Sequence, residues 1–229
     1  MAAEKITKKQ LKEDEFINFF AKIVFYLRTH IRKIGVGALV LAALAAVFAG
    51  VYFYRHSFDE KAAYQMSKAL EVYHQAVSVD SSGSLIAAKE LLEAVIKEYP
   101  SSPAAEAARY YVGNCYFFKG DYDNALTAYE NYLKKHSSGT YAPMAKEGQA
   151  QSWTAKKDLI NAAKEYENLI KTYGAYPMLP EVLMTLGQLY ERMNNPNEAL
   201  RIYKLLVDKF PESQEKIPAQ KRIEILRKS

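Results

Sequence analysis

The stretch "GNCYFFKGDYDNALTAYENYLKK", residues 113–135, contains two amphipathic patterns separated by a polar turn. On each side of the turn GDYDN (120–124), apolar residues recur every three or four positions, which is the spacing of one helical face. Asp121 stands directly before the second pattern, where a carboxylate accepts hydrogen bonds from the free N–H groups that begin a helix. The stretch therefore predicts a pair of short helices joined by a tight turn.

The same arrangement returns along the chain at an interval of 37 residues. Three of the columns that keep this register are an alanine (Ala88, Ala125, Ala162, Ala199), the residue four positions later (Leu92, Tyr129, Tyr166, Tyr203) and the residue twelve positions earlier (Ala76, Gly113, Ala150, Gly187). A small residue lets two helices approach closely, and the residue four positions after the alanine lies on the same helical face. Repeats of this length indicate stacked helix pairs, so the aromatic residues in the columns are expected to form a scaffold.

In the fourth copy the pattern reads Leu183, Leu186, Gly187, Tyr190, Ala199, Tyr203, Leu206 and Pro211, which resembles the tetratricopeptide repeat (TPR). Copies two and three depart from it at Arg109 and Lys146, where a large apolar residue is usual, and at Ser137 and Gly174, which replace the proline. The resemblance covers residues 62–215 and implies an all-α fold, a superhelical solenoid of about four helix-turn-helix repeats. The usual repeat has about 34 residues, and we expect the extra residues here to lie in the loop between repeats.

Residues 35–54, GVGALVLAALAAVFAGVYFY, form a run of twenty residues without a charge. A helix of this length spans about 30 Å, the hydrocarbon thickness of a bilayer. We expect an uncleaved transmembrane helix rather than a cleaved signal peptide, because the run is long and 34 residues precede it. Residues 1–33 contain eight Lys and Arg against four Asp and Glu, which predicts a cytoplasmic N-terminus by the positive-inside rule.

The sequence thus divides into five predicted segments: a basic, partly amphipathic cytoplasmic tail (1–34), a transmembrane helix (35–54), a linker (55–61), the TPR repeats (62–215) and a C-terminal capping helix (216–229). In the tail, one helical face gathers apolar residues, namely Phe16, Phe20, Ile23, Leu27, Ile31 and Ile34, while basic residues occupy the other. This pattern suits a helix lying in an anionic membrane surface, a helix that leads into the span, or a helix that docks on a partner.

Charge and chemistry exclude several classes of function. From residue 56 onward the chain has 22 Lys and Arg against 22 Asp and Glu, so the basic pI belongs to the tail and does not indicate nucleic-acid binding. Cys115 is the only cysteine, and the four histidines show no ligand spacing. Carboxylates such as Glu165 and Glu167 are expected on a solvated helix face. We therefore expect no enzyme, no metal site, no cofactor and no small-molecule substrate.

The TPR resemblance implies a concave groove lined by the first helix of each repeat. The predicted partner-binding residues are Ala107, Tyr110, Asn114 and Phe117 in copy two, Met144, Glu147, Gln151 and Thr154 in copy three, and Glu181, Met184, Gln188 and Glu191 in copy four. Asn114, Gln151 and Gln188 form a column of amides able to hydrogen-bond the backbone of a bound peptide, or simply to face solvent. The groove lacks the Lys and Arg set with which some family members clamp a C-terminal carboxylate.

The layout of tail, span and repeat domain resembles single-pass, membrane-anchored bacterial envelope TPR proteins, such as the ancillary subunit of the Sec translocon or the Tol–Pal-associated division coordinator. The resemblance implies a protein–protein interaction adaptor at the bacterial inner (plasma) membrane, with a periplasmic TPR domain and a protein partner in secretion or envelope assembly. Two alternatives stay open. One is a structural subunit of a membrane complex held through its N-terminal helices, and the other is a receptor with a cytosolic TPR domain.

Overall fold

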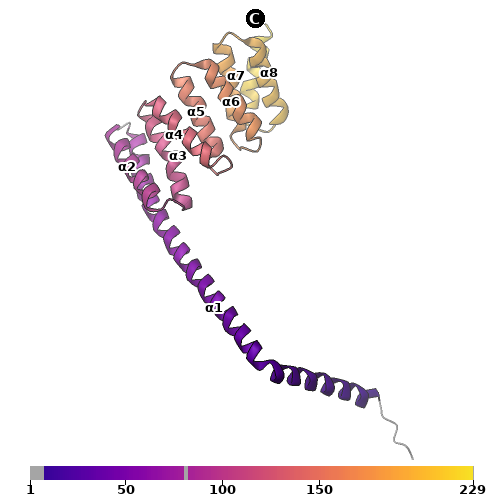
Figure 1. Cartoon of the computed structure of the whole chain (residues 1–229). Coiled ribbons are helices and arrows are strands. Elements are labelled where there is room, and N and C mark those ends of the chain that lie inside the picture. Colours follow the sequence, from indigo (N-terminus) through magenta and orange to yellow (C-terminus); the bar gives the residue numbers. More distant parts are fainter. Residues whose placement is uncertain (1–7, 80–81, 229) are drawn as a thin grey trace, which may run out of the picture. The chain divides into compact units, whose positions relative to one another are not determined.

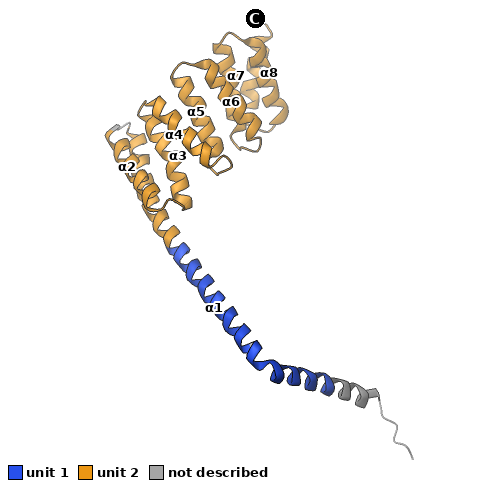
Figure 2. Ribbon diagram, in the orientation of Figure 1, with its two compact units in different colours: residues 1–57 blue, residues 58–229 orange. Residues whose placement is uncertain are grey.

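The computed structural model describes residues 8–79 and 82–228, and all regular elements of these residues are helices, which confirms the expected all-α class (Figure 1). Their bounds are α1 Lys8–Ser78, α2 Ser82–Glu98, α3 Pro103–Phe118, α4 Tyr122–Lys135, α5 Ala142–Ala155, α6 Leu159–Thr172, α7 Leu179–Arg192, α8 Pro196–Lys209 and α9 Lys216–Leu226. From α2 to α9, each helix packs against the next one along the chain. The chain divides into two compact units, Met1–Ser57 and Phe58–Ser229 (Figure 2).

Capping side chains begin several helices of the repeats, as the sequence predicts for Asp121. The side chain of Ser102 accepts a hydrogen bond from the Ala105 N–H at 3.1 Å, and Pro103 follows it in the first turn of α3. Asp121 and Asp158 cap the second helices α4 and α6 in the same way. The polar turns predicted between the two helices of a repeat are therefore present with the expected chemistry.

One residue of each turn adopts the left-handed backbone conformation. Gly120 has φ 81°, Lys157 has φ 64° and Asn194 has φ 53°, and the three positions are 37 residues apart. Glycine takes this conformation without a steric penalty, and asparagine tolerates it better than most residues. Lys157 adopts it as well, so the turn geometry belongs to the repeat and does not depend on a glycine at that position.

Buried tyrosines pack against the small residues of the repeat. A Cβ added at Gly187 would lie 2.3 Å from Cε1 of Tyr203, and one added at Gly113 would lie 2.6 Å from Cε1 of Tyr129. Both rings are buried, with 0% of Tyr203 and 2% of Tyr129 exposed. The ring therefore fills the space that a side chain would occupy at the glycine position. The predicted scaffold role of these columns is confirmed.

The first repeat begins within the long helix α1. Ala62, Met66, Ala69, Tyr73 and Ala76 are buried at helical spacing. All of them except Ala62 belong to one apolar cluster with Leu85, Ala88 and Leu92 of α2. The helix is continuous through residues 55–61, the segment that we expected to act as a linker, because that segment contains neither proline nor glycine. Residues 80 and 81, between α1 and α2, lie outside the described residues.

The N-terminal part of α1 contains the apolar run predicted to span a membrane. By length and composition, the α1 segment Gly35–Ser78 contains a stretch able to cross a bilayer, and none of that stretch is buried in the protein. Leu41 is 68% exposed and Phe48 is 74% exposed. A core helix of a water-soluble domain would bury such side chains against its own chain.

Replacing Gly187 by alanine tests the close helix–ring contact. In an exposed helix, replacing glycine by alanine raises the stability by about 0.5–1 kcal/mol. Overpacking a core lowers the stability by about 1–3 kcal/mol. We expect the Gly187→Ala protein to lose about 1–2 kcal/mol of unfolding free energy, because the new methyl group collides with the Tyr203 ring. The measurement is chemical denaturation followed by the fluorescence of Trp153, the only tryptophan.

Gly174→Ala is the matched control for this substitution. An added Cβ at Gly174 meets nothing within 4 Å, so its unfolding free energy should stay within about 0.5 kcal/mol of the wild type. A Gly187→Ala protein as stable as the wild type, or more stable, would contradict the contact.

Candidate functional site

The twelve residues predicted to bind a partner lie on α3, α5 and α7, and we call them the inner face. Their exposure falls into three groups: Ala107 is buried; Tyr110, Asn114, Phe117, Met144, Glu147, Thr154, Met184 and Glu191 are half-buried; and Gln151, Glu181 and Gln188 are exposed. The most accessible polar groups are therefore on α5 and α7. Of this set, Met144 also lines a surface hollow, together with Pro143, Tyr173 and Tyr176.

On α3 the inner face is aromatic. The ring of Tyr110 stacks on that of Tyr141, with centroids 5.1 Å apart and an angle of 19° between the planes. Burial raises the pKa of the Tyr110 hydroxyl, so it stays neutral at physiological pH. Asn114, one turn further along α3, accepts a hydrogen bond from the hydroxyl of buried Tyr129 at 2.7 Å. The inner-face amide of Asn114 thus holds a core tyrosine.

On α5 the inner face has a carboxylate whose partners in the described structure are neutral. Glu147 accepts hydrogen bonds from the Tyr176 hydroxyl and the Gln151 amide, both at 3.0 Å. Burial raises the pKa of Glu147, the two hydrogen bonds oppose that rise, and the negative charge of nearby Glu181 adds to it. Glu147 is therefore a preoriented acceptor beside a second acidic side chain.

On α7 the inner face is tied to the last helix. Glu191 accepts hydrogen bonds from the Tyr203 hydroxyl at 2.5 Å and from Nε of Arg222, in α9, at 2.9 Å. A second nitrogen of the Arg222 guanidinium bonds the other carboxylate oxygen. Burial raises the pKa of Glu191, but the hydrogen bonds from Arg222 and Tyr203 outweigh it, and the pKa is lowered overall. Glu191 is thus engaged within the chain.

The three amides of the predicted column differ in their surroundings. Asn114 binds Tyr129 and Gln151 donates to Glu147, whereas Gln188 is exposed on α7. Sequence reasoning missed the partners Tyr141, Tyr176 and Arg222. Tyr141 and Tyr176 lie in or next to the loops between repeats, and Arg222 lies in α9, so none of them belongs to the columns that set the pattern.

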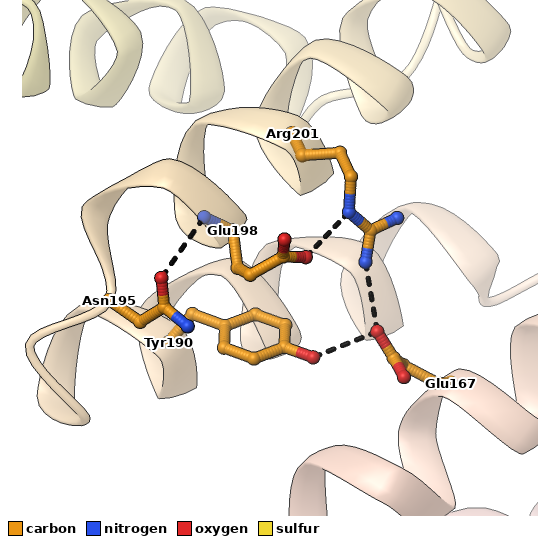
Figure 3. Close-up of polar contacts among 5 residues, drawn as sticks. All are labelled: Glu167, Tyr190, Asn195, Glu198 and Arg201. Atoms are coloured by element: carbon orange, nitrogen blue, oxygen red, sulfur yellow. Dashed lines mark hydrogen bonds and ion pairs between the residues drawn. The ribbon is translucent and has the colours of Figure 1, made fainter.

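Carboxylates of α6 connect helices and do not simply face solvent. Glu165 is half-buried and forms an ion pair at 2.5 Å with Lys146, which explains a charged residue where the TPR pattern has an apolar one. Glu167 accepts hydrogen bonds from the Tyr190 hydroxyl and from Arg201, both at 2.8 Å (Figure 3). The expectation of a solvated face was therefore wrong for half-buried Glu165. Glu167 is exposed, as expected, and it also has partners on other helices.

Comparisons with known proteins agree with this geometry. Tetratricopeptide-repeat models match residues 116–180 and 181–213, and the model of an outer membrane lipoprotein family, YfiO, matches residues 65–146. No curated protein matches the sequence significantly.

Solved structures show the same fold. A tetratricopeptide repeat protein from Parabacteroides merdae ATCC 43184 aligns with a TM-score of 0.54 and 21% identity, over 72% of this chain and 60% of that one. BtubC (BKLC) from P. vanneervenii aligns with a TM-score of 0.54 and 14% identity, over 74% of this chain and 82% of that one. At these identities the likeness concerns the fold alone. Together with the family models, it shows that this chain carries tetratricopeptide repeats.

Proposed function

We propose that this protein is a membrane-anchored adaptor that holds a segment of a partner protein on the inner face of its TPR domain. The observation that carries the proposal is that α1 contains both the exposed apolar run and the first helix of the repeat array. A partner bound to the repeats would thereby be held at the membrane. Solenoids of this kind present extended surfaces for binding proteins.

The inner face suits a peptide or helix of the partner. Exposed Gln151 and Gln188 offer amide donors and acceptors, and the stacked rings of Tyr110 and Tyr141 offer rigid apolar area. Glu147, whose hydrogen-bond partners are neutral, adds an acceptor for a donor of the ligand. We infer binding without catalysis, because the polar groups described above serve to hold helices together or to face a ligand.

Location in the bacterial envelope is part of the proposal. The excess of basic residues before the apolar run favours a cytoplasmic N-terminus and a TPR domain in the periplasm, at the inner membrane. The match of residues 65–146 to an outer membrane lipoprotein family supports an envelope setting. A role in secretion or envelope assembly follows as the kind of process in which such an adaptor would take part.

A second candidate is a structural subunit of a membrane complex. The exposed side chains of Phe19, Phe20 and Phe25 favour it, because large exposed apolar side chains mark contacts with partner proteins or membranes. In that case the essential contacts would be made by the N-terminal part of α1, and the repeats would act as a spacer.

Photocrosslinking of the full-length protein in cells separates the two candidates. A photoreactive residue replaces Gln188 on the inner face, Phe20 in the tail, or one of the exposed controls Lys164 and Lys204 on α6 and α8. We expect a discrete adduct from position 188 and none from positions 164 and 204, because the partner would contact the inner face alone. Adducts from position 20 with none from 188 would favour the structural subunit, and equal adducts at all positions would contradict both.

Reporter fusions at the C-terminus test the sidedness. We expect alkaline phosphatase fused after Ser229 to be active, because the enzyme requires the oxidising periplasm and the basic tail holds the N-terminus inside. A green fluorescent reporter at the same position, which matures in the cytoplasm, should stay dark. A fluorescent fusion with an inactive phosphatase would place the repeats in the cytoplasm and overturn the periplasmic assignment.

A further inference from the structure

The helical segment before the apolar run exposes an unusual amount of apolar surface. Within residues 17–33, nine large apolar side chains are exposed by 38% or more: Ile17, Phe19, Phe20, Ile23, Val24, Phe25, Tyr26, Leu27 and Ile31. Large contiguous apolar surfaces are rare on proteins in water and mark contacts with membranes or partners. This part of α1 therefore requires a surrounding other than bulk water.

Polar residues of the segment gather along one side of the helix. Asn18, Lys22, Thr29 and Lys33 are spaced by four, seven and four residues, which aligns them on one face, and the two arginines 28 and 32 lie beside them. The opposite face holds apolar residues such as Ile23 and Leu27. Phe25 is an exception, because it lies seven residues after Asn18 and four before Thr29, within the polar face. A helix with these two faces is suited to lie along a boundary between apolar and aqueous surroundings.

The charge of the segment is entirely positive. Residues 16–33 contain four basic side chains, Lys22, Arg28, Arg32 and Lys33, and no Asp or Glu. The chain from residue 56 onward contains equal numbers of acidic and basic residues. The positive charge that gives the protein its basic pI is therefore concentrated in the N-terminal region, next to the apolar run. Such clusters beside a membrane span are attracted to anionic lipid headgroups.

Two other placements of the segment are unfavourable. Four charged side chains exclude it from the hydrocarbon core, where each one is costly. Nine exposed apolar side chains exclude it from bulk water. The membrane surface satisfies both requirements, because the apolar face enters the acyl-chain boundary while the lysines and arginines stay among the headgroups.

We propose that residues 17–33 form an in-plane interfacial helix that binds anionic phospholipid headgroups on the cytoplasmic side of the membrane. The inference rests on the proposed span at 35–54, since the span fixes the end of the segment at the membrane surface. It gives the protein a second membrane contact whose strength depends on lipid charge, while the contact made by the span does not.

Spin labelling of the full-length protein in lipid nanodiscs tests this proposal. In a Cys115→Ala background, single labels are attached through Ile23→Cys on the apolar face, Thr29→Cys on the polar face and Leu44→Cys in the span. Accessibility to oxygen, which concentrates in lipid, and to an aqueous nickel complex is measured in phosphatidylcholine discs with and without phosphatidylglycerol. In the discs that contain phosphatidylglycerol, we expect residue 23 to be several-fold more accessible to oxygen than residue 29. We expect residue 29 to be several-fold more accessible to nickel than residue 23.

The charge dependence supplies the decisive control. The difference in oxygen and nickel accessibility between residues 23 and 29 should decrease in phosphatidylcholine alone and at high salt. It should also decrease in the variant Lys22→Gln/Arg28→Gln/Arg32→Gln/Lys33→Gln. The control variant Lys61→Gln/Lys68→Gln, at exposed positions further along α1, should keep it. The proposal would be overturned if residues 23 and 29 were equally accessible to nickel, or equally accessible to oxygen. It would also be overturned if the difference between them were the same with and without phosphatidylglycerol.

The label at Leu44 distinguishes the failure of this inference from the failure of the proposed anchor. If residue 44 is accessible to oxygen and residues 23 and 29 show no contrast, the span holds and only the interfacial helix is wrong. If residue 44 is accessible to nickel, the proposed span is wrong, and the proposal of the interfacial helix, which rests on it, is wrong too.

Discussion

The repeat array depends on the contact between a tyrosine ring and the backbone of a neighbouring helix at a glycine, where no side chain separates the two. Tyr203 lies against Gly187 and Tyr129 lies against Gly113, and in both cases an added Cβ would fall below 3 Å from the ring. The hydroxyl of the same ring then needs a partner, because a buried polar group without one is costly. Glu191 and Asn114 supply it, and both belong to the inner face. The core and the proposed binding face are therefore joined through the tyrosine hydroxyls.

This coupling shapes what the inner face offers a ligand. Inner-face groups that satisfy a core tyrosine are fixed in orientation, and a ligand that competed for them would leave the hydroxyl unpaired. The groups best placed for binding are instead the exposed amides of Gln151 and Gln188, because Glu147 also accepts a hydrogen bond from buried Tyr176. Preoriented polar groups beside the rings of Tyr110 and Tyr141 reduce the entropy that binding costs. The proposed partner site is thus on α5 and α7 with an aromatic border on α3.

The fold followed from the sequence because its determinants are local or periodic. The caps at Asp121 and Asp158 act on the next few residues, and the 37-residue interval aligns small residues with rings. The candidate site was less predictable, because its polar partners come from outside the repeated columns. Arg222 lies in α9, which is not a copy of the repeat, and the ion pair of Lys146 with Glu165 joins two helices. The twelve inner-face positions came from the family pattern and stay a prediction as a binding site.

The most direct measurement of the central claim is a double-mutant cycle on Gly187 and Tyr203. The unfolding free energy is measured for the wild type, Gly187→Ala, Tyr203→Leu and the double variant, by denaturation followed through Trp153. If the ring occupies the space above the glycine, leucine at position 203 removes the collision. Gly187→Ala should then cause no loss of unfolding free energy in the Tyr203→Leu background, which corresponds to a coupling energy of about 1 kcal/mol or more. Additive costs, with alanine equally harmful in both backgrounds, would contradict the account.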